Sequence, residues 1–298
     1  MAVIQYAGEF QLEECTLCTV SGLELDLTEL VADINIYEDL FSTSVSGTIS
    51  FQDNNNLLGN KNIGIIGQEK LKLKLSTPNA DDTSDRNRII NYTETPLYIY
   101  KIDDKVKVNE NTDAFMLHFT TPEFIRNNHV RVVKSYEGEP SEDIIQNILR
   151  DDDLIASKKE FYYEITNNHF KLVSPNMHPF DFIVNLSKRC LSREYDYAPS
   201  FLFYETTKGY FFRTIDSMMD RKNPKGVFRE VSPQEIDLRD NEEGVIAKLT
   251  NILDIQIMST TDTMSSRLSG MYGSRLVLLD IFNKDYQEFD YNYLQDFD

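Results

Sequence analysis

The sequence predicts a mainly β protein with an α+β insertion in its middle. The chain holds 16 tyrosines and 18 phenylalanines among its 298 residues and no tryptophan, and many of these rings lie in segments that alternate between apolar and polar residues. Aromatic enrichment at a period of two is typical of β-strands. The period becomes helical near residue 142 and again near residue 180. At roughly 150 residues per domain, the length favours about two domains.

Residues 1–121 are expected to form the first β domain. In Lys70 to Leu75 the alternation is strict, with leucines facing a core and lysines facing solvent. Polar turns rich in Asp and Asn separate the strands. The alternating segments are residues 34–37, 45–51, 70–75, 95–100 and 114–120. Several short antiparallel strands of this kind indicate a barrel or a sandwich.

Residues 122–231 are expected to form the α+β insertion. A helix near 142–150 should have Ser141 as its N-cap and an apolar stripe that includes Ile144 and Ile148. A second helix near 180–191 should begin at Pro179, because proline is favoured in the first helical turn. The aromatic segments near 200–213 predict a hairpin that turns between Thr206 and Gly209.

Residues 232–298 are expected to form a second β domain that is cut short at Asp298. Ser232-Pro233-Gln234-Glu235 has the pattern of a capping box, and residues 251–259 alternate. Gly270 to Gly273 predicts a turn, and strands are expected over 276–282 and 286–293.

The charge balance argues against several classes of function. The net charge is −19 and the isoelectric point is near 4.6, so the surface repels nucleic acid phosphates at range. Mean hydropathy is −0.41, and no apolar run approaches the roughly 18 residues of a membrane span. No export signal is visible at the N-terminus, and three cysteines are too few for a disulfide scaffold. We therefore expect an acidic protein of a reducing compartment, with no membrane insertion by this chain.

Residues that could carry chemistry are present without a recognisable motif. Cys15 and Cys18 have redox-motif spacing, but they lie in a predicted strand, where residues three apart face opposite sides. The four histidines have no zinc-ligand spacing. They are His118, His129, His169 and His178. Acidic pairs such as Asp103-Asp104, Asp151 to Asp153 and Glu242-Glu243 are interpreted as solvated loops. We therefore assign no catalytic, cofactor-binding or metal-binding residue and expect no enzyme activity.

The aromatic cluster at Phe201 to Tyr204 and Tyr210 to Phe212 allows two interpretations. Such rings could stack on nucleic acid bases, but stacking platforms also need interleaved Lys and Arg, which this cluster lacks. Packing in a core or at a subunit interface is the favoured interpretation.

Four segments together resemble one family of proteins. They are residues 35–53 with Gly67-Gln68-Glu69, residues 121–138, residues 200–213 and residues 270–280. In this order they are similar to the first barrel, the approach to a helical insertion, a hairpin and the second barrel of the baseplate hub proteins of contractile-tailed (T-even-like myovirus) bacteriophages. The ordered series is more specific than any one segment.

The resemblance implies a structural virion protein and not an enzyme. It implies two tube-like antiparallel β-barrel domains, at 1–121 and at 232–298, separated by the insertion. The second is expected to be incomplete, because family members continue further. Three copies would form a pseudo-six-fold ring that adapts the six-fold tail tube to the three-fold central spike. The implied partners are two further copies, the spike, tube or tube-initiator proteins and other baseplate subunits. DNA would only pass through the channel, in a virion assembled in the host cytoplasm.

Two alternatives remain beside the phage hub. One is a tail-associated cell-wall hydrolase that uses a carboxylate pair. The other is the spike-hub of a contractile secretion system, which would share the fold. In either hub, the final segment from Tyr286 to Phe297 is a candidate docking segment.

Overall fold

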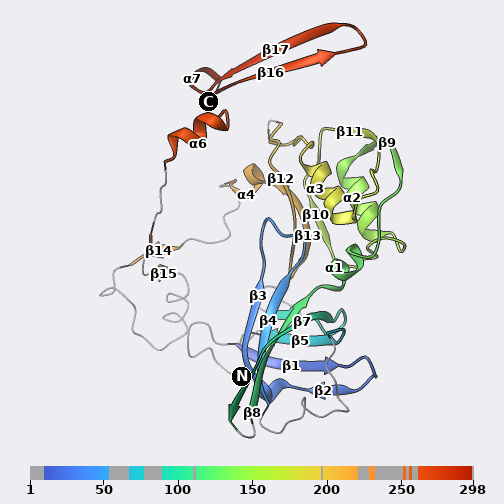
Figure 1. Ribbon diagram of the computed structural model, residues 1–298, viewed down its shortest axis with the longest axis vertical. Coiled ribbons are helices and arrows are strands. Elements are labelled where there is room, and N and C mark those ends of the chain that lie inside the picture. Colours follow the sequence, from blue (N-terminus) through green and yellow to red (C-terminus); the bar gives the residue numbers. More distant parts are fainter. Residues whose placement is uncertain are drawn as a thin grey trace. The chain divides into compact units, whose positions relative to one another are not determined.

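The computed structural model describes residues 10–53, 67–76, 89–109, 112–195, 197–220, 228–231, 251–252, 255–256 and 261–296 (Figure 1). The chain divides into two compact units. The first is Met1–Phe228 with Ile236–Thr250, and the second is Arg229–Glu235 with Asn251–Asp298. Among the described residues, no helix is long and apolar enough to cross a membrane.

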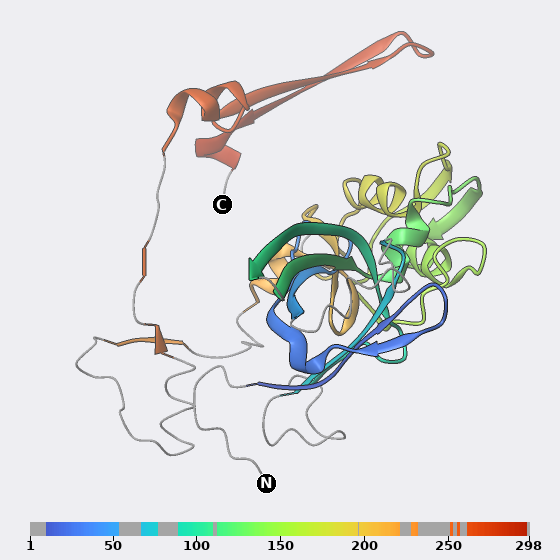
Figure 2. The ribbon, with the colours of Figure 1, turned by 60° about the horizontal axis from the view of Figure 1, so that its bottom comes forward.

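An eight-stranded antiparallel sheet forms the first part of the first unit. Its strands are β1 (Gln11–Cys18), β2 (Glu24–Asp26), β3 (Val31–Tyr37), β4 (Ser46–Asp53), β5 (Lys70–Ser76), β6 (Ile89–Asn91), β7 (Leu97–Asn109) and β8 (Thr112–Thr120). The order is β2-β1-β5-β7-β8-β4-β3, and β6 pairs with β5. The sheet curls into a half-barrel (Figure 2). The prediction of a mainly β protein is therefore confirmed.

The alternation of apolar residues sets which face of the sheet is buried. Leu71 and Leu73 of β5 are fully buried, whereas Lys70, on the other face, is exposed. Gly47 of β4 permits a close approach, because a Cβ there would lie 2.3 Å from Phe119 Cζ and 2.3 Å from the Asn35 carbonyl oxygen. The ring of Phe119 thus occupies the space that a side chain at position 47 would need.

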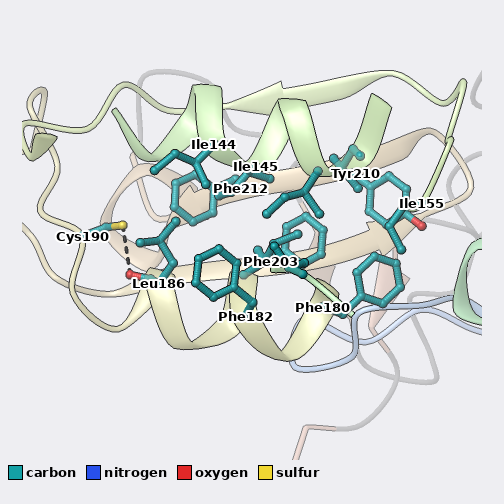
Figure 3. Close-up of a cluster of buried hydrophobic side chains, with 14 of the residues drawn as sticks. Ile144, Ile145, Ile155, Phe180, Phe182, Leu186, Cys190, Phe203, Tyr210 and Phe212 are labelled. Carbon is teal, nitrogen blue, oxygen red and sulfur yellow. Dashed lines mark hydrogen bonds between the residues drawn. The ribbon is translucent and has the colours of Figure 1, made fainter. Parts of the chain in front are cut away.

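The α+β insertion completes the described part of the first unit. Its elements are α1 (Pro122–Asn127), β9 (Ser135–Pro140), α2 (Ser141–Arg150), β10 (Phe161–Tyr163), β11 (His169–Val173), α3 (Pro179–Ser187), β12 (Phe201–Thr206), β13 (Gly209–Thr214) and α4 (Ile215–Met218). One sheet has the order β10-β13-β12, and β11 pairs with β9. Helices α2 and α3 pack on the three-stranded sheet around Phe180, Phe203 and Tyr210 (Figure 3).

Both predicted helices and the predicted hairpin are present, with two corrections. Ser141 is not the N-cap of α2, because Pro140 holds that position in extended conformation and Ser141 is the first helical residue. The Ser141 hydroxyl is fully buried and accepts a hydrogen bond from Cys190 Sγ at 3.0 Å. Helix α3 begins at Pro179 as predicted but ends at Ser187, four residues early.

The second unit is described in part. Its elements are β14 (Arg229–Glu230), β15 (Asn251–Ile252), α6 (Thr263–Leu268), β16 (Gly273–Asp280), β17 (Asp285–Asn292) and α7 (Tyr293–Asp296). Strands β16 and β17 confirm the two strands predicted there. The capping box at 232–235, the acidic pair at 242–243 and most of the alternating segment 251–259 lie outside the described residues. The boundaries near 121 and 231 and the second barrel stay predictions.

Candidate assembly surface and buried ionic junction

Strands β16 and β17 form an antiparallel hairpin whose paired residues are all exposed. The register runs from Gly273 opposite Asn292 to Asp280 opposite Asp285. At the tip, Phe282 is 97 % exposed. The tip is held by Asp280 Oδ1, which accepts from the backbone N–H groups of Phe282 at 2.9 Å and Asn283 at 3.0 Å. These bonds, with one from the Asn283 side chain, lower the pKa of Asp280. The apolar tip therefore projects from an ordered turn.

The two faces of this hairpin differ in character. Directly opposed residues share a face, and the face alternates along each strand. One face carries a bidentate ion pair, with Arg275 Nε 2.6 Å from Asp290 Oδ1 and Arg275 Nη2 2.9 Å from Asp290 Oδ2. The other face carries four apolar or aromatic side chains beside Ser274, Asp280, Asp285 and Gln287. Its apolar members, here called the hairpin face, are Leu276, Leu278, Phe289 and Tyr291.

The hairpin face needs a partner surface to be stable. Leu276 is 56 % exposed and Phe289, directly opposite, is 52 % exposed. An isolated two-stranded hairpin is marginally stable in water, and it usually needs another element packed on its apolar face. No described residue of the second unit buries these side chains. This face is the candidate assembly surface.

A buried ionic junction lies where the insertion meets the eight-stranded sheet. Lys159 Nζ is 2.5 Å from Glu205 Oε1 and 2.7 Å from Glu123 Oε2. The second oxygen of Glu205, Oε2, accepts from the Val45 backbone N–H at 2.9 Å and from the Thr121 hydroxyl at 2.9 Å. A strand of the insertion is thereby tied to the segment that precedes β4 and to the segment that follows β8.

Burial governs the charges of this junction. Glu205 is 1 % exposed, and burial raises its pKa, an effect that Lys159 opposes. Burial by itself lowers the pKa of Lys159, but the carboxylates of Glu205 and Glu123 outweigh it and hold that pKa above its ordinary value. Lys159 therefore rests as a cation between two carboxylates, with its Nζ also 5.9 Å from the centre of the Tyr210 ring.

The aromatic residues of the insertion hairpin divide between its two faces. Phe203 and Phe212 are buried in the core, as the favoured interpretation predicted (Figure 3). The opposite face carries a row of three stacked rings across three strands. Tyr162 stacks on Phe211 at 4.8 Å between centroids, and Phe211 stacks on Tyr204 at 5.3 Å.

The cysteines lie where the strand period places them. Cys15 is fully buried and Cys18 is half-buried on the other face of β1. Burial raises the pKa of Cys15 to about 12 and that of Cys190 to about 11, which opposes formation of the thiolate that redox chemistry requires.

Histidines and acids form no metal cluster among the described residues. His178 Nδ1 lies 3.0 Å from two backbone carbonyls, and His118 Nε2 lies 3.6 Å from Asp103. The Asp151 side chain accepts from the Asp153 backbone N–H in the turn after α2. His129 and His169 lie in separate parts of the insertion, at the end of α1 and at the start of β11.

Sequence reasoning did not find the ionic junction. One feature of the sequence does indicate the junction. In β12 every second residue faces the core, and these residues are Phe201, Phe203 and then Glu205. An acid in an inward position of an aromatic strand requires a buried partner. That partner, Lys159, lies in a loop with no regular period, so its role could not be read from spacing.

The fold is similar to that of a known tail protein. No family model and no curated protein matches the sequence. The structure is similar to the tail protein from Neisseria meningitidis MC58, with a TM-score of 0.51 and 10 % identity, over 96 % of this chain and 68 % of that one. This likeness confirms, at the level of the fold, the predicted resemblance to tail proteins.

Two further structures align less closely. The 43 kDa tail protein of prophage MuSo2 from Shewanella oneidensis has a TM-score of 0.46 and 12 % identity, over 73 % of this chain and 56 % of that one. An E. coli component of the type VI secretion system has a TM-score of 0.37 and 9 % identity, over 75 % of this chain and 52 % of that one. The chain thus spans little more than half the length of these two proteins.

Proposed function

We propose that this chain is a structural tail protein, a trimeric baseplate hub that adapts a six-fold tail tube to a three-fold central spike. The observation that carries the proposal is the fold likeness to the Neisseria tail protein over 96 % of the chain. The ordered sequence resemblance to contractile-tail hubs supports the narrower role. Partners would be two further copies, the spike, tube or tube-initiator proteins and other baseplate subunits.

The symmetry argument rests on two barrel domains in each copy. The curled eight-stranded sheet would form the first tube-like barrel, and the second unit would contribute the second. Three copies would then present six similar domains in a ring, which is the geometric requirement for joining three-fold to six-fold symmetry. The hairpin face supports the proposed assembly, because a neighbouring subunit would bury its apolar side chains.

The acidic charge fits a channel through which DNA passes without adhering. A bore lined with carboxylates would repel phosphates and let the genome slide. The net charge of −19 motivates this idea. A map of the assembled ring with a basic bore would contradict it. The protein would act in the tail baseplate of the virion after assembly in the host cytoplasm.

The mass of the purified chain tests the proposal. Native mass spectrometry, with the chain alone and mixed with the spike protein, should give three times 34.6 kDa in at least one condition. A chain that stays monomeric at high concentration and with spike and tube partners would contradict the hub.

A cell-wall hydrolase is the competing function that a simple assay addresses. The two carboxylates that the described structure brings together, Glu123 and Glu205, are buried around Lys159 and do not face a polymeric substrate. We therefore expect no turnover of peptidoglycan by the purified chain. Measurable turnover would support the hydrolase function instead.

A further inference from the structure

The buried ionic junction has the parts of an acyl-transfer site arranged around one lysine. A reaction of this class needs a nucleophile, a carboxyl electrophile, a proton acceptor and donors for the developing oxyanion. Lys159 Nζ is a nitrogen nucleophile 2.5 Å from Glu205 Oε1. Because a C–O bond is about 1.2 Å long, the Glu205 carboxyl carbon lies no more than about 3.7 Å from that nitrogen. This is close to the roughly 3–3.5 Å of a near-attack geometry.

The two carboxylates are not equivalent, and the difference assigns their roles. Glu205 Oε2 receives two hydrogen bonds at 2.9 Å, from the Val45 backbone N–H and the Thr121 hydroxyl. Donors placed in this way stabilise negative charge as it develops on that oxygen. Glu123 receives one hydrogen bond on its far oxygen, at 2.9 Å from the Ser157 hydroxyl, and its near oxygen lies 2.7 Å from Lys159 Nζ. Glu205 is thus set up as the electrophile and Glu123 as the proton acceptor.

We propose that Lys159 and Glu205 condense autocatalytically into an isopeptide bond, with Glu123 as the general base and acid. A proton first passes from the Lys159 ammonium to Glu205 Oε1. The free amine then attacks the carboxyl carbon, and the attacking nitrogen gives a proton to Glu123. Protonated Glu123 finally delivers that proton to Oε1, the C–O bond breaks and water leaves. An ammonium and a carboxylate become one amide and one water, and Glu123 returns to its starting state.

Burial penalises the charged forms of Lys159 and Glu205. Glu205 is 1 % exposed, Tyr210 is fully buried and the side chain of Lys159 is 14 % exposed. Holding charges in such a site costs free energy because they have lost their hydration. Burial also raises the pKa of Glu205, which eases the first proton transfer. The amide removes the charges of Lys159 and Glu205, while Glu123 loses its cation and keeps the hydrogen bond from the Ser157 hydroxyl.

The bond would link two segments of the insertion that lie 46 residues apart in sequence. A covalent link between them removes loop-closure entropy from the unfolded chain, as a disulfide does. It forms without an oxidant, so it suits a protein of a reducing compartment whose cysteines are free.

Intact-mass spectrometry of the folded full-length chain tests the proposal. The wild-type chain should weigh one water molecule less than its sequence requires, and fragmentation of a proteolytic digest should show a branched peptide joining Lys159 to Glu205. A folded wild-type chain at its full sequence mass would overturn the proposal. A link from Lys159 to Glu123 would overturn the choice of electrophile.

Three variants assign the roles. Lys159→Arg should keep the full sequence mass, because the guanidinium stays protonated and does not attack the Glu205 carboxyl carbon. Glu123→Gln should slow the loss of water, since the proton acceptor is gone, and unchanged conversion would overturn that role. Lys171→Arg is the matched control, because Lys171 makes an exposed ion pair with Glu137 at 2.8 Å, and it should lose water as the wild type does. If Glu123→Gln does not fold, the peptide map of the wild type still shows whether Lys159 is joined to Glu205.

Discussion

The backbone N–H of Val45 donates to the carboxylate of Glu205 over 2.9 Å, although the two residues are 160 positions apart. Val45 precedes β4 of the large sheet, and Glu205 belongs to β12 of the insertion. Thr121, which follows β8, donates to the same carboxylate oxygen. The junction between sheet and insertion is therefore polar and directional, and it fixes how the two parts of the first unit meet.

Replacing Lys159 by Met should destabilise the first unit strongly. The change leaves the carboxylates of Glu123 and Glu205 buried without their cation, and loss of one partner of a buried ion pair costs about 3–5 kcal/mol. Loss of the proposed Lys159–Glu205 amide would add to this cost. Urea unfolding followed by circular dichroism measures the effect at neutral pH. A loss no larger than that of Lys171→Met, a change in an exposed pair, would contradict the importance of the junction.

The deficit of Lys159→Met should shrink as the pH falls. Burial raises the pKa of Glu205 in the folded state above its ordinary value, and Lys159 opposes that rise, so loss of Lys159 should raise the pKa further. A raised folded-state pKa means that the protonated form stabilises the fold fully below the unfolded pKa, about 4.3 for Glu, and that this contribution is lost as the pH rises through the folded pKa. Unfolding curves of the wild type and the variant at about pH 5 and about pH 8 should show a smaller difference in stability at the lower pH. A loss of stability that does not depend on pH would contradict the raised pKa of Glu205.

Gly47→Ala should destabilise the eight-stranded sheet. The new Cβ would lie 2.3 Å from both Phe119 Cζ and the Asn35 carbonyl oxygen, so a ring and a backbone strand would have to move. Overpacking of this kind costs about 1–3 kcal/mol. Thermal unfolding provides the measurement. Gly273→Ala is the matched strand control, because its Cβ would meet nothing nearer than the Tyr291 carbonyl oxygen at 3.4 Å, and it should leave the midpoint almost unchanged.

The three thiols should differ in reactivity. In the folded chain Cys15 and Cys190 are fully buried and burial raises their pKa values to about 12 and about 11, so neither forms a thiolate near neutral pH. Cys18 is half-buried and should react first with a thiol reagent. Titration with a chromogenic disulfide should count a single thiol in the native chain and all three in urea. Cys18→Ser should abolish the native reaction, and native labelling of Cys15 would contradict its burial.

Polar substitution on the hairpin face should weaken assembly. The double change Leu276→Ser and Phe289→Ser removes two exposed apolar side chains that lie opposite each other. We expect the trimer population in native mass spectra to fall, because the surface that drives association has lost its apolar area. Val277→Ser, on the opposite face beside Glu288, is the control and should assemble normally. Equal assembly of both proteins would contradict a role for this face.

The sequence predicts well those elements that local patterns determine. The strict alternation of Lys70 to Leu75 yields a strand with leucines inward, and Pro179 marks the first residue of α3. Ser141 failed as a predicted N-cap because Pro140 before it is already extended, and the serine hydroxyl is instead bound to Cys190, which lies 49 residues away. Local preference was overridden by a distant contact.

The ionic junction could not be predicted from local sequence patterns for the same reason. Glu205, Lys159 and Glu123 come from a strand, a loop and a helix, and only the tertiary fold brings them together. The inward position of Glu205 in β12 indicates that a partner exists but does not identify it. The hairpin face, in contrast, follows from the pairing of β16 with β17, because directly opposed residues share a face.

The order of strands in the large sheet has a consequence for synthesis of the chain. In the described sheet, β2, β1 and β5 stand on one side and β4 and β3 on the other, and β7 with β8 joins the two sides. Strand β4 therefore waits for β8, whose Leu117 pairs with Ile49, before its second edge is covered. Such long-range pairing makes folding slow. Until Thr120 has left the ribosome, the nascent chain therefore carries an open edge on β4, and an open strand edge can pair with another chain.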